Sequence, residues 1–450
     1  MPDMMHNKYP SVSLYALHCQ EKLTRFHAIL EATAFDSIII GSGSKKTQFQ
    51  DDLPYPFVAN PYFREWVPLG KRAESFLRIS AASNRPQLYF LTIEDIWHTP
   101  PQQLPDGFEN CLEIIEYANT DDLKQQLVQP NQSVVLLNET NDLNVPVDHF
   151  NPNVVLNQID FQRRNKTPYE HACIRMANEM AVPAHRAAEE AFRSGASELE
   201  IASAYLSACD CGESDMPYGI IAGVNEHAAV LHHTDLSKNR VKPKSFLIDA
   251  GVACNGYAAD ITRTYAFDKG SDFSAMIEQM DKVQHELVAL GGIGECPLEL
   301  HVQSQHKIAQ VMIDFNLLNY SAEQAVGQGV IDSFYPHGLG HHLGCNVHDK
   351  GSQLATPQGD PIPASKIYPN LRASARMESN QVHTVEPGLY FIPPLLGRLR
   401  VSDLADSVNW AEIENWLPFG GIRIEDNIIL HSDDTLENVT REAFSSIKGG

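Results

Sequence analysis

A chain of 450 residues is too long for one ordinary hydrophobic core, which predicts two domains, with three as the alternative. Hydrophobic residues make up 43% and charged residues 20%, the proportions of an ordinary globular protein, so the composition argues against a disordered chain. The formal net charge of −23 argues against nucleic acid or an anionic membrane surface as a partner, because both are bound by a basic face.

The targeting and redox features of the sequence favour the cytoplasm. The first residues lack a basic segment followed by an apolar one, so they do not resemble a secretory signal. No stretch of about eighteen apolar residues predicts a membrane span. The 8 cysteines are scattered without a Cys-x-x-Cys pair, a pattern typical of free thiols in a reducing compartment. We therefore expect a cytoplasmic protein with no membrane partner.

The first part of the chain predicts an α/β domain over residues 1–160. An amphipathic segment at 14–32 predicts a helix. Short apolar runs predict buried strands at 35–43, 87–93 and 132–139. The alternation of helical and extended segments favours a compact α/β arrangement.

A second domain is predicted over residues 161–450. Thr167 and Glu170 have the spacing of a capping box and predict the start of a long helix, and Ser197 and Glu200 repeat the pattern. Helical segments then alternate with apolar runs that predict strands at 245–251, 384–391 and 421–430.

The segment HGLGHHLGCNVHD, residues 337–349, contains four histidines. Its glycines argue against a long helix. The zincin pattern of two histidines four residues apart, with a glutamate after the first, is absent because Gly338 follows His337. Locally the segment is open to three interpretations: a metal site, a proton relay or a polar stretch.

The stretch at 245–265 predicts a β-hairpin with Asn255 and Gly256 at its turn. In that register Asp249 pairs opposite Thr262, so Asp260 lies diagonal to Asp249 on the same face. Diagonal side chains lie about 7–8 Å apart, close enough to share a cation that offsets their repulsion and desolvation. The alternative is that both aspartates lie on the surface beside the hairpin.

Two further carboxylates occur in apolar strands. Glu386 lies in TVEPG, and Glu425 lies in GIRIED, where Ile422 and Ile424 point to one face and Arg423 and Glu425 to the other. Either glutamate alone would be interpreted as a charge on an edge strand. Four carboxylates in apolar strands together with a histidine-rich loop favour a metal site.

In this order the motifs resemble the pita-bread metallopeptidases, and within them most closely the Xaa-Pro dipeptidases, or prolidases. They are Asp249 and Asp260 separated by ten residues, HGLGHxxG, TVEPG and GxRxED. The segments at 48–63 and 417–442 resemble the bacterial branch that includes organophosphorus acid anhydrolase. The resemblance covers nearly the whole chain. It implies an α/β (α+β) protein with an N-terminal α/β domain followed by a C-terminal pita-bread catalytic domain.

The resemblance also implies a ligand set around two divalent ions: Asp249, Asp260, His341, Glu386 and Glu425. Four carboxylates and one imidazole favour Mn²⁺, with Co²⁺ or Zn²⁺ as substitutes. Glu386 is the expected proton shuttle, Arg423 orients the site, and His337 and His348 donate hydrogen bonds to substrate and oxyanion. The resemblance implies that His232 and Arg372 hold the carboxylate of the substrate. His342 has no implied role, and as a packed or solvated imidazole it needs none.

The implied activity is the hydrolysis of Xaa-Pro dipeptides, with a side activity on organophosphorus triesters and fluoridates and assembly as a homodimer. Two alternatives stay open: an enzyme of the aminopeptidase P type, which acts on longer peptides, and a non-catalytic pita-bread binding module. The sequence departs from the family pattern at Cys345 and His383, where aliphatic or apolar residues are usual. Neither residue is an implied ligand.

Overall fold

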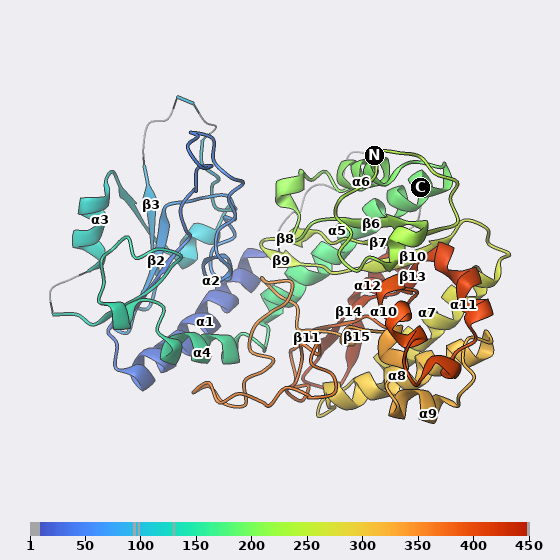
Figure 1. Ribbon diagram of the computed structural model, residues 1–450. Coiled ribbons are helices and arrows are strands. Elements are labelled where there is room, and N and C mark those ends of the chain that lie inside the picture. The colour runs from blue at the N-terminus through green and yellow to red at the C-terminus, as the bar shows by residue number, and fades with distance from the viewer. Residues whose placement is uncertain (1–9, 93–95, 98–99, 129–130, 448–450) are drawn as a thin grey trace. The chain divides into compact units, whose positions relative to one another are not determined.

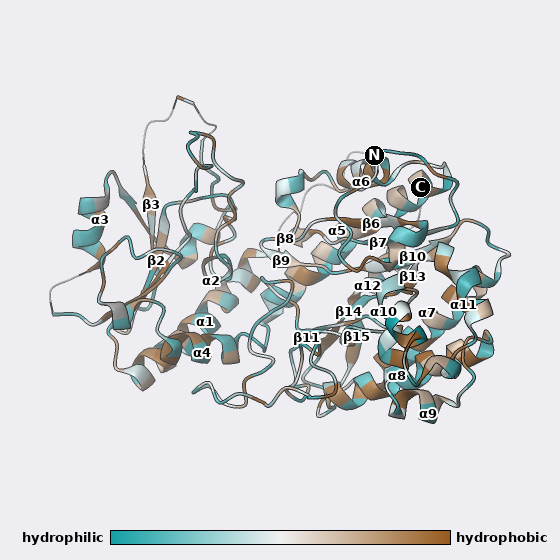
Figure 2. Cartoon of the chain, viewed as in Figure 1, coloured by the Kyte–Doolittle hydropathy of each residue, from teal (hydrophilic) through white to brown (hydrophobic). Residues whose placement is uncertain are grey.

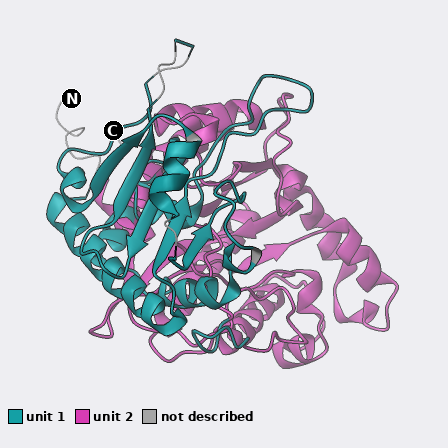
Figure 3. Cartoon of the chain, turned by 90° about the vertical axis from the view of Figure 1, so that its left-hand side faces the viewer, with its two compact units in different colours: residues 1–173, 254–257, 354–361 teal, residues 174–253, 258–353, 362–450 magenta. Residues whose placement is uncertain are grey.

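The computed structural model describes residues 10–92, 96–97, 100–128 and 131–447 (Figure 1). The chain divides into two compact units, coloured in Figure 3: unit 1 is Met1–Cys173, Cys254–Tyr257 and Leu354–Pro361, and unit 2 is Ile174–Ala253, Ala258–Gln353 and Ile362–Gly450. The predicted boundary between residues 160 and 161 stays a prediction. Within the described ranges no helix is both long and apolar enough to cross a bilayer.

Unit 1 is built on a mixed five-stranded sheet in the order β4-β3-β2-β1-β5. Its strands are β1 (Ser37–Gly41), β2 (Ser75–Ser80), β3 (Gln87–Leu91), β4 (Glu113–Tyr117) and β5 (Val134–Leu137). β1 is antiparallel to β2 and parallel to β5, and β3 is antiparallel to β2 and parallel to β4. β1, β3 and β5 confirm the three predicted strands; residue 93, the expected end of the second, lies outside the described residues.

The first helix of unit 1 covers this sheet with one apolar face. α1 (Val12–Thr33) confirms the helix predicted at 14–32, and its Phe26, Ile29 and Leu30 share a buried core with Ile38 of β1. The unit also contains α2 (Pro61–Arg64), α3 (Thr120–Leu127), α4 (Asn153–Gln162) and the first residues of α5 (Pro168–Arg193). α3, with the sequence TDDLKQQL, is largely hydrophilic in Figure 2.

Unit 2 combines small sheets with long helices. Its sheets have the orders β10-β7-β6, β11-β14-β15 and β12-β13, and the two-stranded sheet β8-β9 is divided between the units, with Cys254 and Tyr257 counted in unit 1. The strands are β6 (Ile221–Val224), β7 (Ser245–Asp249), β8 (Ala253–Cys254), β9 (Tyr257–Ala258), β10 (Thr262–Ala266), β11 (Val382–Val385), β12 (Gly388–Tyr390), β13 (Gly421–Arg423), β14 (Asp426–Leu430) and β15 (Leu436–Asn438). The three strand segments predicted in this domain are confirmed, and the second and third each divide into two strands.

The helices of unit 2 bury apolar faces in a core shared with these strands. They are the rest of α5, α6 (Glu198–Ala208), α7 (Asp272–Leu290), α8 (Pro297–Asp314), α9 (Ala322–Gly327), α10 (Pro393–Arg400), α11 (Trp410–Trp416) and α12 (Val439–Ser446). Met280 of α7 and Ile308 of α8 lie in one apolar cluster with Ile422 and Ile428 of the strands. α8 carries both hydrophobic and hydrophilic colours in Figure 2, as a helix with one buried face does.

Both predicted capping boxes are present. The backbone N–H of Thr167 donates to Glu170 Oε2 (2.7 Å), and the backbone N–H of Glu170 donates to Thr167 Oγ1 (3.4 Å). Ser197 and Glu200 exchange the same pair of bonds before α6. These reciprocal bonds satisfy backbone donors that the first helical turn leaves unpaired.

Glu170→Gln is expected to lower the free energy of unfolding by about 3–5 kcal/mol near neutral pH, the usual cost of removing one partner from a buried ionic cluster. Glu170 is buried, accepts a hydrogen bond from the Tyr257 hydroxyl (2.9 Å) and faces Lys22 and His18. Burial alone would raise the pKa of Glu170, but these neighbours outweigh it and lower the pKa to about 2.

Because the folded-state pKa is depressed, the carboxylate stabilises the fold above its ordinary pKa of 4.5, and this contribution is lost as the pH falls through about 2. Urea unfolding at a series of pH values should therefore show the deficit of Glu170→Gln shrinking as the medium becomes more acid. Glu31→Gln, at an exposed position of α1, is the control. A deficit that does not change with pH would contradict the assignment of the stabilisation to the charge.

Candidate metal centre

The hairpin predicted around Asn255 and Gly256 is present and sets the first two candidate ligands. Both turn residues have positive φ, 51° and 88°, the conformation that a tight hairpin requires. Thr262 pairs opposite Asp249 between β10 and β7, as predicted. The backbone N–H of Asp260 donates to the side-chain oxygen of Asn427 (3.0 Å), which fixes the segment just before β10.

The alternation predicted around Glu425 is also confirmed. Ile422 and Ile424 lie in the apolar core of unit 2, whereas Arg423 and Glu425 line a pocket. Glu425 stands between β13 and β14, and its backbone N–H donates to the carbonyl oxygen of Thr262 (3.1 Å). The Thr262 hydroxyl donates to Glu425 Oε2 (2.6 Å), so the same threonine connects this carboxylate to the strand that begins just after Asp260.

The histidine-rich segment contains no helix, as predicted, and its residues 341–343 lie beside β11, to which an isolated bridge joins His342. The backbone N–H of Thr384 donates to the carbonyl oxygen of His341 (2.9 Å). A Cβ at Gly340 would lie 2.0 Å from the carbonyl oxygen of Thr384, so only glycine permits this approach. His341 and Glu386 are brought to the same pocket in this way.

One pocket of about 470 Å³ in unit 2 brings all the predicted site residues together. They are His232, Asp249, Asp260, His337, His341, His348, Arg372, Glu386, Arg423 and Glu425. Side-chain donor atoms of Asp260, His341 and Glu425 all lie within 4.8 Å of one another. Residues that are nearly 200 positions apart in sequence therefore converge on one volume.

Three of the carboxyl groups in this pocket, those of Asp249, Glu386 and Glu425, have raised pKa values. Burial, together with the charge of Asp260, raises the pKa of Asp249 although Arg423 opposes the shift. Burial and the neighbouring Asp260 raise the pKa of Glu386 to about 7 against the effect of His341. Burial and the neighbouring carboxylates of Asp260, Glu386 and Asp249 raise the pKa of Glu425 well above its ordinary value. The pocket therefore favours a proton or a cation at these oxygens.

The donor set fits divalent cations. Asp249 Oδ1 is buried and has no hydrogen-bond partner in the part of the chain that the structure describes, so a strong acceptor faces the pocket unused. His341 Nδ1 donates to the carbonyl oxygen of His342 (3.0 Å), which leaves Nε2 facing Asp260 Oδ2 and Glu386 Oε1 at 3.4 and 3.5 Å. This bond fixes the ring orientation that ligating histidines use.

Hydrogen bonds through Tyr390 connect Arg423 to His337. The Arg423 guanidinium donates to Asp249 Oδ2 (2.8 Å), to Thr262 Oγ1 (3.1 Å) and to the Tyr390 hydroxyl (2.8 Å). His337 Nδ1 donates to the carbonyl oxygen of Gly338 (2.8 Å), so its Nε2 accepts from the Tyr390 hydroxyl (2.8 Å). Burial and the charge of Arg423 lower the pKa of His337 to about 3, which keeps the ring neutral.

The remaining predicted residues present exposed side chains to the pocket. His232, His348 and Arg372 are all solvent-accessible. Burial of the His348 ring on the pocket side, together with His341 and Arg372, lowers its pKa to about 4, so the ring is neutral at physiological pH. A neutral donor and a guanidinium at the open part of the pocket suit a ligand that carries negative charge.

Several residues that hold the site are absent from the sequence-based prediction. The Tyr218 hydroxyl donates to Asp260 Oδ1 (2.6 Å), and the Thr384 hydroxyl donates to Glu386 Oε1 (3.3 Å). The predicted register placed Thr262 opposite Asp249 but gave it no contact with Glu425, and no sequence signal marks Tyr218 or Tyr390. Two departures from the family pattern, Cys345 and His383, are buried and lie outside the pocket lining. His342 is buried beside His383, with ring centroids 4.4 Å apart.

Comparison with known families identifies the architecture. The family model "Metallopeptidase family M24" matches residues 172–432, and "Xaa-Pro dipeptidase, N-terminal domain" matches residues 13–161. The chain belongs to metallopeptidase family M24. The family is one of hydrolases that use divalent metals, and Asp260, His341 and Glu425 in the pocket could hold such an ion. The predicted resemblance is confirmed.

Relatives of this M24 chain match it from end to end. It is 40% identical over 431 residues to the Xaa-Pro dipeptidase of Pseudoalteromonas translucida, covering 95% of this chain and 98% of the relative. It is 41% identical over 436 residues to the Xaa-Pro dipeptidase of Shewanella loihica, covering 96% and 98%. The fold is similar to that of aminopeptidase P from Escherichia coli in its low-pH form, with a TM-score of 0.72, 22% identity and 96% coverage of both chains. These comparisons confirm the predicted fold class.

Proposed function

We propose that this M24 hydrolase is an Xaa-Pro dipeptidase. The observation that carries the proposal is a single pocket of about 470 Å³ in which the buried carboxylate and imidazole set lies together with exposed Arg372 and His232. A pocket of this size suits a ligand as small as a dipeptide. The Xaa-Pro dipeptidases that match the chain over nearly its full length support the same substrate class.

The proposed cofactor is a pair of divalent ions, Mn²⁺ with Co²⁺ or Zn²⁺ as substitutes. The proposed ligands are Asp249, Asp260, His341, Glu386 and Glu425, a set dominated by oxygen donors. When bound, such ions supply Lewis acidity toward the scissile carbonyl and make hydroxide available near neutral pH. The hydrogen bonds from Tyr218, Thr262 and Thr384 hold three of these carboxylates in place.

Glu386 is the proposed proton shuttle. Its pKa of about 7 in the absence of bound cations lies where a carboxyl takes up and releases protons easily, and cations would lower it and leave a ready acceptor. A prolyl nitrogen needs a proton before it can leave, so a carboxyl that also faces the ions is well placed to supply it. His348, neutral and exposed to the pocket, is the proposed donor to negative charge that develops on the substrate.

His337 is proposed to assist from the same wall of the pocket. Both its ring nitrogens are hydrogen-bonded to protein, to the Gly338 carbonyl and the Tyr390 hydroxyl. Donation from His337 to the substrate therefore requires Nδ1 to exchange its bond to Gly338 for one to the ligand. Arg423 is a positioning residue in this scheme, since it holds Asp249 and Tyr390 at once.

The dipeptidase proposal is tested by comparing Mn²⁺-dependent turnover of Leu-Pro with that of Leu-Pro-Gly. A dipeptidase hydrolyses Leu-Pro and leaves the tripeptide largely intact, because the carboxylate that Arg372 and His232 would bind is displaced by the added residue. Preference for Leu-Pro-Gly would show an enzyme of the aminopeptidase P type. No turnover of either peptide by protein that retains Mn²⁺ would favour the binding module.

Arg372→Ala is expected to raise the KM for Leu-Pro by about 10–100-fold while leaving the Mn²⁺ content unchanged, the loss expected for one charge-assisted hydrogen bond to a carboxylate. Steady-state kinetics and elemental analysis measure both quantities. Arg376→Ala is the matched control, because Arg376 is exposed on the same segment, donates to the Gly294 carbonyl (2.7 Å) and lies outside the pocket lining. Equal kinetics for Arg372→Ala and wild type would remove Arg372 from the substrate site.

A side activity on organophosphorus triesters and fluoridates is proposed for the same pocket. A pentavalent phosphorus centre is tetrahedral and has a polar P=O, which resembles the tetrahedral centre formed from a peptide carbonyl. Fluoride or phenolate leaves with less need of a proton than a prolyl nitrogen. Purified protein should release fluoride from a fluorophosphate in a Mn²⁺-dependent reaction that Leu-Pro inhibits competitively; release no faster than a metal-only control would reject this activity.

Two further properties are proposed on the same basis. We place the enzyme in the cytoplasm, which the free state of all eight cysteines supports. We also propose a homodimer, as the resemblance to prolidases implies; the mass in solution from sedimentation or light scattering tests it.

A further inference from the structure

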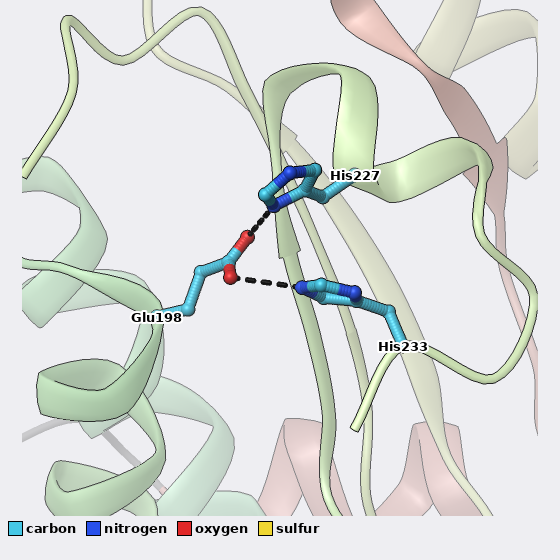
Figure 4. Close-up of side chains that lie close together, drawn as sticks. All are labelled: Glu198, His227 and His233. Atoms are coloured by element: carbon cyan, nitrogen blue, oxygen red, sulfur yellow. Dashed lines mark hydrogen bonds and ion pairs between the residues drawn. The ribbon is translucent and has the colours of Figure 1, made fainter. Parts of the chain in front are cut away.

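A second cluster of metal-ligating side chains lies outside the pocket lining. Glu198 is the first residue of α6, His227 belongs to the short helix η4 (Asn225–Ala229), and His233 lies in the loop that follows. Figure 4 shows both imidazoles pointing at the one carboxylate: His227 Nδ1 is 2.7 Å from Glu198 Oε1, and His233 Nε2 is 2.8 Å from Oε2. The ligating atoms of the three residues lie within 4.8 Å of one another.

We propose that Glu198, His227 and His233 bind one Zn²⁺ ion at a site separate from the dinuclear centre. Two imidazoles and one carboxylate form a ligand set that zinc uses, with water as the fourth ligand. The presence of two nitrogen donors distinguishes the cluster from the oxygen-rich catalytic set and favours a transition ion over Mg²⁺ or Ca²⁺.

The carboxylate is already held in the way that ligating carboxylates are held. The backbone N–H of Val224 donates to Glu198 Oε1 (2.9 Å), and that of Ser237 donates to Oε2 (2.8 Å). Burial would raise the pKa of Glu198, but the hydrogen bonds from His233, Val224, Ser237 and His227 outweigh it and lower the pKa. Glu198 is therefore ionised at neutral pH, although its side chain is only 3% exposed.

Binding requires a small rearrangement. In a tetrahedral zinc site with bonds of about 2.0–2.1 Å, donor atoms lie about 3.3 Å apart. The three ligating atoms lie within 4.8 Å of one another, so the two nitrogens would have to adjust toward a common point beside the carboxylate. Each ring nitrogen that now donates to Glu198 would give up its proton, and the ring would carry a proton on its other nitrogen. His227 has room for this change because its side chain is 44% exposed.

Space for the fourth ligand lies beside the cluster. Glu198 and His227 line a pocket of about 70 Å³ together with Ser197 and Asn225. One water molecule needs only about 10–15 Å³ of such volume. The pocket therefore accommodates a water or hydroxide on the ion and provides its route from solvent.

The alternative is that the cluster only anchors the segment 224–237 to α6 by hydrogen bonds. His227→Gln separates the two interpretations, because a glutamine amide can still donate to Glu198 but offers no imidazole to an ion. The matched control is His285→Gln on α7, where one exposed histidine lies beside one carboxylate, with Nδ1 3.4 Å from Asp281 Oδ2.

The test counts Zn²⁺ ions per chain in full-length protein after equilibrium dialysis against Zn²⁺, and locates them by anomalous diffraction at the zinc edge. We expect an anomalous peak between Glu198, His227 and His233 in wild type, and a loss of one ion per chain in His227→Gln but none in His285→Gln. Peaks confined to the dinuclear centre, or equal zinc content in His227→Gln and wild type, would overturn the proposal. The readout is the position and number of ions, so it stands apart from any outcome of the Leu-Pro assay.

Discussion

Glu425→Gln is expected to abolish dipeptide hydrolysis, by more than about 100-fold, without unfolding the protein. Removing a group that only hydrogen-bonds to a metal ligand costs up to about 100-fold. Because Glu425 is itself a proposed ligand, its removal should cost more. The fold should survive because the pKa of Glu425 is raised well above its ordinary value by burial and by Asp260 and Glu386. Because its pKa is raised, this carboxyl keeps its proton to a higher pH than an exposed glutamate when no ions are bound, so a neutral amide of the same shape replaces it at little cost.

The amide oxygen of the variant can still accept the bond from the Thr262 hydroxyl. We therefore expect equal melting temperatures for metal-free wild type and metal-free Glu425→Gln, and a rise on addition of Mn²⁺ that is much smaller in the variant. Glu189→Gln, which removes a half-exposed carboxylate paired with Arg193 on α5, is the control for the loss of one charge. A Glu425→Gln variant that binds Mn²⁺ and hydrolyses Leu-Pro at the wild-type rate would reject the metal assignment.

Local chemistry explains why much of the site was predictable. The turn at Asn255 and Gly256 determines the register of the strands on either side, and this register places Thr262 opposite Asp249. Alternation along a strand likewise separates Arg423 and Glu425 from Ile422 and Ile424. Both rules connect residues that are close in sequence, and for that reason one sequence was sufficient to apply them.

The supporting contacts could not be predicted because they join distant segments. Tyr218 reaches Asp260 across 42 positions, and Tyr390 lies between His337 and Arg423. The strand prediction at 421–430 also missed the change of partner at Glu425, where β13 pairs with β12 and β14 pairs with β11. A change of pairing partner is a tertiary property that alternation does not report.

The adjacent residues His232 and His233 also have contacts that the sequence could not predict. His232 lines the pocket of the proposed metal centre, whereas His233 turns to Glu198, 35 positions earlier in the chain. The sequence shows two neighbouring imidazoles and nothing that tells their directions apart. Only the folded loop assigns one to the substrate pocket and the other to the proposed zinc site.

His341→Ala is expected to lose turnover, whereas His342→Ala is expected to lose stability. His341 Nε2 faces Asp260 and Glu386, so its removal should lower turnover by more than about 100-fold at saturating Mn²⁺. His342 is fully buried and its ring lies 4.4 Å from that of His383, so its removal leaves a cavity. We expect a loss of about 2–5 kcal/mol in the free energy of unfolding for His342→Ala, with turnover per folded molecule nearly unchanged.

The loss of turnover and the loss of stability can be measured separately, because neither substitution removes the backbone atoms of the segment. The carbonyl oxygen of His342, which accepts from His341 Nδ1, remains in His342→Ala, so the orientation of His341 is retained. Leu-Pro turnover at saturating Mn²⁺, corrected for the folded fraction from urea unfolding, measures both quantities on the same samples. Similar losses of turnover in the two variants would contradict the assignment of His341 alone as the ligand from this segment.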